Sequence, residues 1–312
     1  MRVFLAGATG AIGRPLVPRL IAAGHELTTM TRSERSAEAL RGQGAHALEL
    51  DVFDREGVRD ALVAARPDAV VHELTALPHR FNPRDKQLYA PTNRVRTEGT
   101  RNLLAAAAAA GARRFVCQSI AFAYAPGGAR VKTEEARLFL DSPPPFGEAV
   151  KALEQMEGMV LGAEAMEGLV LRYGWFYGPG TYYAADGSSA ADVRRRRFPL
   201  VGKASGVFSF IHVDDAADAT VAALERGAPG AYNVVDDEPA AMREWLPVYA
   251  KALGAKPPRR VPAWLARIVA GKMIAEMAES LPGASSEKAK RELGWAPAHP
   301  SWRTGFAESL RG

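Results

Sequence analysis

A glycine-rich turn near the N-terminus constrains the fold of this chain more than any other feature. The sequence GATGAIG places Gly7, Gly10 and Gly13 directly after the apolar run RVFLAG and before a stretch with a helical pattern. Glycines at this spacing allow a tight turn, close approach of the backbone to a pyrophosphate, and packing of a helix whose N-terminus attracts phosphates. A tight turn without a ligand is the plainer alternative, but the strand before it and the helix after it favour dinucleotide binding.

Short apolar runs alternate with helical patterns throughout the first half of the chain. Strands are expected at residues 2–7, 26–31, 47–50, 68–74, 113–119 and 168–174. The helices between them include 11–24 and a long one over 92–112, which contains an alanine run. This alternation predicts an α/β protein with a doubly wound parallel sheet of the Rossmann type.

The pattern changes after Gly174, where a loop-like segment rich in glycine, serine and aromatic residues begins. Further strands are expected at 208–213 and 231–235, and helices at 242–254 and 262–281. The sequence therefore predicts a smaller, mostly helical C-terminal lobe for the substrate. We expect a dinucleotide-binding domain of residues 1–175, to which 208–236 returns, and a substrate lobe of 176–207 and 237–312.

The composition excludes several other classes of protein. No stretch approaches the roughly 18 to 20 apolar residues needed to span a bilayer, and the N-terminus lacks the features of a signal peptide. The single cysteine, Cys117, excludes an internal disulfide framework and fits a cytoplasmic protein. The net charge of +5 comes mostly from scattered arginines, and six histidines show no zinc-type spacing. We therefore expect a small-molecule substrate, with no nucleic acid, membrane or metal partner.

The residues after the second predicted strand favour NADP(H) over NAD(H). An acidic residue at this place accepts from the ribose of NAD, whereas a basic residue meets the 2′-phosphate of NADP. Thr31, Arg32 and Arg35 stand there, with no acid at the strand end. A surface arginine is the plainer interpretation of Arg32. After the third strand, Asp51 and Val52 are placed to hold the adenine through a side-chain acceptor and an apolar contact.

Motifs spread in order over nearly the whole chain resemble one known family. They are GATGAIG, LDVFD, NRVRTEGTRNLLAAAAAAGARRFVCQS, LVLRYGWFYGPG, FSFIHVDDAADATVAALE, AYNVVDDEP and RELGWAP. Together they resemble the extended short-chain dehydrogenases/reductases, which include the NAD-dependent epimerases and dehydratases, and in particular their atypical bacterial members. The resemblance implies further cofactor contacts from Thr9, Ala11, Ile12, Leu74, Lys151 and Tyr173.

The resemblance also implies a catalytic Ser or Thr and a Tyr-x-x-x-Lys pair, in which the lysine lowers the pKa of the tyrosine that exchanges a proton with the substrate. Aligning KALE puts Lys151 in the lysine position and Gly147 in the tyrosine position. Aligning on Tyr124 puts Ile120 in the serine position and Ser119 one residue earlier. The chain is thus expected to be an atypical member that lacks the usual tyrosine. The expected catalytic candidates are Lys151, Ser119, Tyr124 and Thr75.

The expected substrate pocket is aromatic and carries few charges. Phe208 stands where nucleotide-sugar members commonly place an arginine that grips the diphosphate. The run Arg194 to Arg197 leaves a phosphate contact open, so nucleotide sugars are disfavoured without being excluded. The candidate walls, one or two of which are expected to be core residues instead, are Trp175, Phe176, Tyr177, Tyr182 and Tyr183.

These observations favour an NAD(P)H-dependent oxidoreductase, above all a ketoreductase of a small apolar or aromatic carbonyl compound. A nucleotide-sugar epimerase or dehydratase is the first alternative, although those reactions use the tyrosine directly. A non-catalytic dinucleotide-binding sensor or structural protein is the second. The resemblance further suggests a homodimer through the two long helices around the fifth strand, where LLAAAAAAG supplies small residues. Packing of those alanines on the protein's own sheet explains them equally well.

Overall fold

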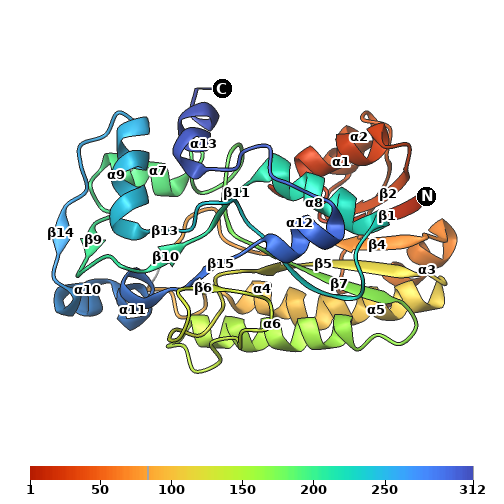
Figure 1. Cartoon of the computed structure of the whole chain (residues 1–312). Coiled ribbons are helices and arrows are strands. Elements are labelled where there is room, and N and C mark those ends of the chain that lie inside the picture. Colours follow the sequence, from red (N-terminus) through yellow and green to blue (C-terminus); the bar gives the residue numbers. More distant parts are fainter. Residues whose placement is uncertain (83, 312) are drawn as a thin grey trace.

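The computed structural model describes residues 1–82 and 84–311, and shows a seven-stranded sheet between two layers of helices with a smaller lobe beside it (Figure 1). The strand order is β3-β2-β1-β4-β5-β7-β12, and all six pairings are parallel. The strands are β1 (Arg2–Ala6), β2 (Glu26–Thr31), β3 (His46–Glu49), β4 (Ala69–His72), β5 (Arg114–Ile120), β7 (Glu167–Tyr173) and β12 (Gly230–Val234). Because the chain leaves β1 in both directions, the sheet is doubly wound, and the predicted Rossmann fold is confirmed.

Helices cover both faces of this sheet, which explains why the strands are apolar runs rather than alternating patterns. Side chains of β1 alternate between the faces, with Val3 and Leu5 in one buried cluster and Phe4 and Ala6 in the other. The helices of the first layer are α1 (Gly13–Ala22), α2 (Glu34–Arg41), α8 (Val213–Glu225) and α12 (Glu287–Leu293). The helices of the second layer are α3 (Arg55–Ala65), α5 (Thr100–Ala109) and α6 (Phe146–Leu161).

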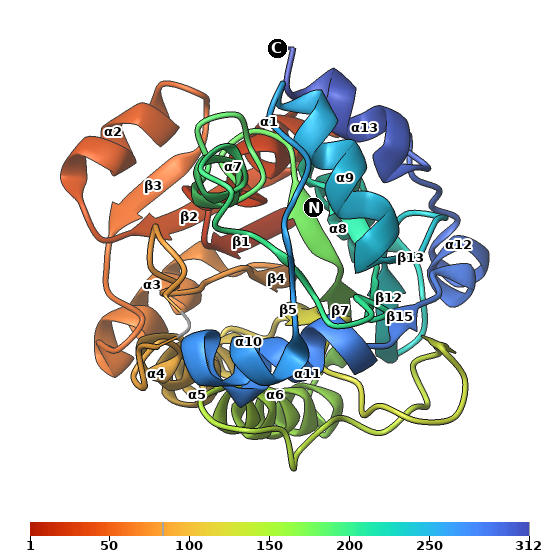
Figure 2. The same ribbon diagram turned by 90° about the vertical axis from the view of Figure 1, so that its left-hand side faces the viewer.

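The lobe has a separate apolar core, in which Trp245 and Trp302 are fully buried. Its helices are α7 (Ser188–Arg194), α9 (Met242–Ala252), α10 (Ala263–Ala270), α11 (Lys272–Ser280) and α13 (Trp302–Ser309). Four short pairs of strands lie outside the main sheet: β6 (Val131–Lys132) with β15 (Gly283–Ala284), β8 (Trp175–Tyr177) with β11 (Phe210–His212), β9 (Leu200–Val201) with β14 (Arg260–Val261), and β10 (Val207–Phe208) with β13 (Ala240–Ala241). Figure 2, seen from the lobe side, shows α10 and α11 in front of the layer that contains α5 and α6. The domain boundaries expected from the sequence stay a prediction.

Three predicted elements are interrupted in the structure. The helix expected over 92–112 consists of α4 (Ala90–Arg94), a π-helical turn η1 (Val95–Gly99) and α5. The helix expected over 262–281 breaks at Gly271, whose φ of +94° favours glycine and cannot continue a helix. The strand expected over 208–213 forms β10 and β11, which flank Ser209 and lie outside the main sheet. The Ser209 hydroxyl accepts from the Ala284 N–H at 2.8 Å, which fixes the chain at this interruption.

Candidate functional site

The glycine-rich turn between β1 and α1 has room for no side chain at two of its three glycines. Gly7 has a φ of +112°, and a Cβ there would lie 2.6 Å from the carbonyl carbon of Glu73. A Cβ at Gly13 would lie 2.1 Å from the carbonyl oxygen of Gly7. No side chain caps the start of α1, and although the Arg14 N–H donates to the Gly10 carbonyl at 3.1 Å, the Gly13 N–H forms no bond within the described chain and stays available to an anion. This cradle fits the pyrophosphate of a dinucleotide, and Thr9 and Gly10 are exposed beside it.

The residues expected at the adenosine end lie at the ends of β2 and β3. Arg32 and Arg35 are exposed and form no ion pair with the other described residues. The acid between them, Glu34, accepts from Arg41 Nη1 at 2.5 Å, so it is directed along α2. Asp51 is exposed and its carboxylate accepts from the Phe53 N–H at 2.9 Å. Two cations and one carboxylate therefore stand at the strand ends where an adenosine would lie.

Apolar positions complete the predicted cofactor site. Val52 and Ile12 are buried, whereas Ala11 and Leu74 are half-buried. The Val52 carbonyl accepts from the Asn102 side chain at 3.0 Å, which ties the end of β3 to α5. The roles of these residues toward a cofactor stay predictions.

A buried acid, Glu73, lies directly beneath the glycine-rich turn. Its carboxylate accepts from the Tyr173 hydroxyl at 3.2 Å, and Tyr173 also shares a hydrogen bond of 2.7 Å with Thr220. Burial raises the pKa of Glu73 to about 8, although the hydrogen bond from Tyr173 opposes this shift. Tyr173 was expected to contact the cofactor, but its side chain is fully buried with its hydroxyl engaged by Glu73 and Thr220. Its contact with a cofactor stays a prediction.

Ser119 and Tyr124 belong to a buried network that joins β5, β7, β12 and α6. The Ser119 hydroxyl donates to Glu157 at 2.5 Å, and Glu157 forms a buried ion pair with Arg172 at 2.5 Å. Arg172 donates to the Tyr124 hydroxyl at 2.9 Å, and that hydroxyl donates to Asn233 at 2.6 Å. Burial also raises the pKa of Tyr124 to about 12. Both hydroxyls therefore take part in bonds within the protein, and their catalytic role stays a prediction.

Lys151 lies on the exposed face of α6. Its helix neighbours on that face, Glu148 and Gln155, are exposed as well. The opposite face carries Phe146 and Val150, which are buried, as the helical spacing of i and i+4 requires. The structure thus separates Lys151 from the side of α6 that faces the sheet, in contrast to the predicted contact with a cofactor. Thr75, the fourth catalytic candidate, is exposed two residues beyond Glu73.

A continuous series of aromatic rings runs from α6 into the lobe. Phe146 and Phe122 have ring centroids 6.4 Å apart and nearly parallel planes, and Phe122 stacks on Trp175 at 4.0 Å. Trp175 contacts Phe208 in turn at 5.3 Å. The indole N–H of Trp175 is buried without a hydrogen-bond partner among the described residues. Beside these rings lies a mostly apolar pocket, lined by Phe122, Tyr124, Pro126, Phe139, Ser142, Phe146, Met273, Glu276, Met277, Ser280, Leu281 and Pro282.

The predicted aromatic walls of the substrate pocket divide into two groups. Trp175 is half-buried in the ring series, and Phe176 is half-buried against Tyr173. The Tyr182 hydroxyl donates to the carbonyl of Pro78, which links the lobe to the segment after β4. Tyr177 is fully buried, and Tyr183 is nearly so. These two tyrosines are core residues of the lobe, in line with the expectation that one or two of the candidate walls belong to the core.

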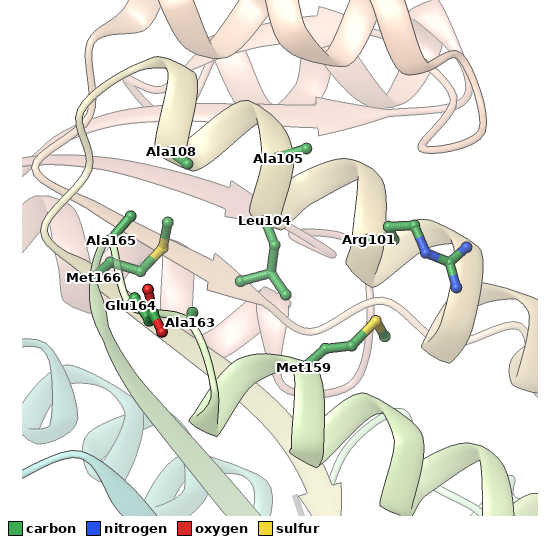
Figure 3. Close-up of a pocket in the computed structure, with 9 residues that line it drawn as sticks. All are labelled: Arg101, Leu104, Ala105, Ala108, Met159, Ala163, Glu164, Ala165 and Met166. Carbon is green, nitrogen blue, oxygen red and sulfur yellow. The ribbon is translucent and has the colours of Figure 1, made fainter.

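A groove on the outer face of the second helical layer lies away from these residues. Figure 3 shows it between α5 and the segment from the end of α6 to β7. Its lining is mostly small or apolar: Arg101, Leu104, Ala105, Ala108, Met159, Ala163, Glu164, Ala165 and Met166. This is the pair of helices for which the sequence suggested a subunit interface.

Several residues of the site were missed in the sequence. Phe122 and Phe146 are ordinary apolar residues in a strand and a helix pattern, and only their ring contacts distinguish them. Val150 lies on the buried stripe of α6, a signal that the helical periodicity of the sequence already contained. Glu73 and Arg96 are buried ionisable residues, and charged residues are normally expected at the surface.

Comparisons with known proteins agree on the type of fold and on redox chemistry. The model of the NAD dependent epimerase/dehydratase family matches residues 3–235. A protein of Streptomyces sp. named 3-diazoavenalumate denitrifying reductase is 48% identical over 308 residues, which are 98% of this chain and 99% of that protein. The 4-hydroxy-2-methyl-3-oxo-4-farnesyl-3,4-dihydroquinoline-1-oxide ketoreductase of Stigmatella aurantiaca is 27% identical over 82% of this chain and 74% of its own. The crystal structure of UDP-glucose 4-epimerase from Thermotoga maritima, 20% identical, has a TM-score of 0.78 and covers 100% of this chain and 98% of that one.

Proposed function

Since the chain belongs to the NAD-dependent epimerase/dehydratase family, and is an NAD(P)-dependent oxidoreductase of the extended short-chain type, we propose that it reduces an aromatic diazonium compound with loss of N₂. The prediction of an oxidoreductase is confirmed by the reductases among its relatives. The choice of substrate is our proposal. It is carried by the absence of a tyrosine and a lysine from the buried face of α6, together with the name of the Streptomyces relative.

The Tyr-x-x-x-Lys spacing of the family fits Phe146 and Val150, one residue before the alignment used above. Both side chains are buried on the face of α6 that also carries Glu157, whose carboxylate bonds to Ser119 on β5. Lys151, one residue further, is turned away from the sheet. We therefore assign the tyrosine and lysine positions to a phenylalanine and a valine, neither of which can hold or move a proton.

A reaction that consumes no proton suits such a site. When bound, the reduced nicotinamide supplies a hydride. Addition of that hydride to the terminal nitrogen of Ar–N≡N⁺ gives Ar–N=NH, which loses N₂ and leaves Ar–H, so charge and atoms balance without an acid. Reduction of a ketone, in contrast, requires one proton for the new hydroxyl. Loss of the tyrosine removes the proton donor of a ketoreductase but nothing that a diazonium reduction needs.

The aromatic series supports the same class of substrate. The faces of aromatic rings attract cations, and a diazonium group is a cation on a planar ring system. Phe146, Phe122 and Trp175 are stacked or nearly parallel, and the first two of them line the mostly apolar pocket. The part these chain residues play is to orient a flat cationic ring and to exclude water from it.

We further propose NADPH as the preferred cofactor. The exposed guanidinium groups of Arg32 and Arg35 at the end of β2 support it, because they are not neutralised by described carboxylates and suit a 2′-phosphate. Glu34, the acid in this segment, is held by Arg41.

The proposed reaction is tested with NADPH deuterated at nicotinamide C4 and a simple aryl diazonium salt. We expect the protein to produce one N₂ per NADPH oxidised, to leave hydrogen on the ring carbon that carried the nitrogen, and to oxidise the deuterated cofactor more slowly than ordinary NADPH. Boiled protein measures the reaction that occurs without catalysis. Equal rates with native and boiled protein would reject the diazonium proposal.

Ketone reduction is the second candidate, because the Stigmatella relative is named a ketoreductase. A panel of aromatic ketones with NADPH distinguishes the two functions through proton uptake in weakly buffered solution. We expect no proton uptake with the diazonium salt and little or no turnover of ketones. Ketone turnover with one proton taken up per NADPH would make the ketoreductase the better description.

We also propose that two copies associate through α5 and α6. Ala105 and Ala108 are exposed on α5, and Leu161 is 43% exposed at the end of α6, so the groove offers small and apolar residues for close helix packing. Ala108→Glu is expected to convert a dimer into a monomer in light scattering after size-exclusion chromatography. The matched control is Ala39→Glu on the exposed face of α2, which is expected to leave the mass unchanged. A monomeric parent protein, or a dimer that survives Ala108→Glu, would contradict this interface.

A further inference from the structure

We propose that Arg96 binds the nicotinamide riboside half of the dinucleotide by donating hydrogen bonds to its hydroxyl oxygens. In this role a side chain from η1 replaces the lysine that the family places on α6. The proposal rests on dinucleotide binding alone and does not depend on which substrate is reduced.

Arg96 is a buried cation without a carboxylate partner. Its side chain is 7% exposed, and among the described residues no acidic oxygen lies within ion-pair distance of it. Its side chain forms one hydrogen bond within the described chain, a long one of 3.5 Å from Nη1 to Asn93 Oδ1. A guanidinium carries five N–H donors, and buried charges are normally paired. Most of its donors are therefore left for a ligand.

The other buried guanidinium of the described residues shows what a structural arginine looks like in this protein. Arg172 is 6% exposed and donates to Glu157 through both Nε and Nη2, at 3.0 and 2.5 Å. It also donates to Tyr124 and to the carbonyl of Glu134. Since Arg172 is saturated and Arg96 is not, burial alone does not account for the missing partners of Arg96.

The position of Arg96 fits a cofactor contact. It lies on the π-helical turn, a feature often found at functional sites, and this turn packs against α6. His72 at the end of β4 and Cys117 on β5 are its neighbours, and the carboxylate of Glu157 on α6 is close enough to interact with its charge although it forms no ion pair with it. Ligands of doubly wound sheets bind at the carboxyl ends of these strands. Burial lowers the pKa of Arg96 to about 10, so the guanidinium stays charged at neutral pH.

The neighbouring face of α6 explains why a replacement is needed. Val150 is fully buried there and offers no donor, whereas Lys151 points to solvent. On our proposal, an arginine from the neighbouring turn η1 of the same helical layer restores a cation between α6 and the strand ends. Its fork of donors suits the paired hydroxyl oxygens of a ribose.

Dinucleotide fragments provide the test. Equilibrium binding is measured for NADPH and for adenosine 2′,5′-bisphosphate, which carries the adenosine half and lacks the nicotinamide riboside; NADH and ADP are measured in parallel. Arg96→Met is expected to weaken NADPH binding about tenfold or more and to leave the fragment unchanged, since the loss of one charge-assisted hydrogen bond is of that order. Arg96→Lys is expected to weaken NADPH binding less than Arg96→Met does. Arg101→Met on the exposed side of α5 is the matched control.

The outcomes separate a ligand contact from a structural role. A selective loss for the intact dinucleotide supports the proposal, and it is measurable whether or not any substrate is turned over. Equal weakening of dinucleotide and fragment, or no weakening of either, would overturn it. So would the same selective loss in Lys151→Met together with normal binding in Arg96→Met. If Arg96→Met does not fold, judged by thermal unfolding, Arg96→Lys decides the question by the same comparison.

Discussion

Gly13→Ala is expected to abolish dinucleotide binding. The new Cβ would lie 2.1 Å from the Gly7 carbonyl oxygen and 2.5 Å from the carbonyl carbon of Ala8, and both are backbone atoms. Such overlap is relieved only by moving the turn away from the start of α1, which destroys the cradle for a pyrophosphate. We expect the Kd for NADPH to rise by about 100-fold or more, equivalent to roughly 3 kcal/mol. Titration calorimetry measures it directly.

A second glycine replacement serves as the control for this experiment. A Cβ at Gly158, on α6, meets no atom within 4 Å. Gly158→Ala is therefore expected to keep the affinity for NADPH and to stabilise the protein by about 0.5 to 1 kcal/mol, since alanine favours a helix over glycine. Unchanged binding in a folded Gly13→Ala protein would show that the turn is not the phosphate site.

Glu73→Gln is expected to raise the free energy of unfolding at pH 8. Glu73 is fully buried and its folded-state pKa is about 8, compared with an ordinary value of 4.5. The difference corresponds to roughly 5 kcal/mol of stability that depends on pH. A glutamine keeps an oxygen that accepts from the Tyr173 hydroxyl and has no carboxyl proton to lose. The two proteins are compared by urea unfolding at several pH values from 4.5 to 8.

The sign of this effect follows from the direction of the pKa shift. Below pH 4.5, Glu73 is protonated in both the folded and the unfolded chain, so its pH-dependent contribution to the free energy of unfolding is fully present. Between pH 4.5 and 8 the unfolded chain releases this proton and the folded chain retains it, so the free energy of unfolding falls as the pH rises. The variant is expected to lack that part of the decline, whereas Glu154→Gln at an exposed position of α6 is expected to retain it. Parallel pH profiles for wild type and Glu73→Gln would contradict the prediction.

The main sheet could be predicted from the sequence because its strands are buried on both faces. Runs such as AVVH in β4 and the glycine turn after β1 are local signals, and local signals fix the alternation of strands and helices. The interruptions of the predicted helices and strands were harder to predict from the sequence. The helix break at Gly271 depends on a positive φ, and glycines occur inside helices as well, for example Gly158 in α6.

The roles predicted for the site residues stay predictions, both at the turn and around α6. Neighbouring residues on a helix point about 100° apart, so an alignment on Lys151 and one on Val150 select different faces of α6. Ser119 lies on β5 and Tyr124 follows that strand, but their partners Arg172 and Glu157 come from distant segments. Contacts between distant segments leave no periodic signal in a single sequence. The burial of Arg96 could not be predicted from the sequence for the same reason.

The π-helical turn at Val95–Gly99 has a consequence for how this protein differs from its relatives. A π turn contains one residue more than an α turn. Deleting one residue there would rotate α4 by about 100° relative to α5 and change which side chain points inward at position 96. On our proposal the π turn and the inward arginine therefore form one functional unit. Relatives that keep a lysine on the sheet-facing side of α6 are expected to have a shorter, regular helix at this place.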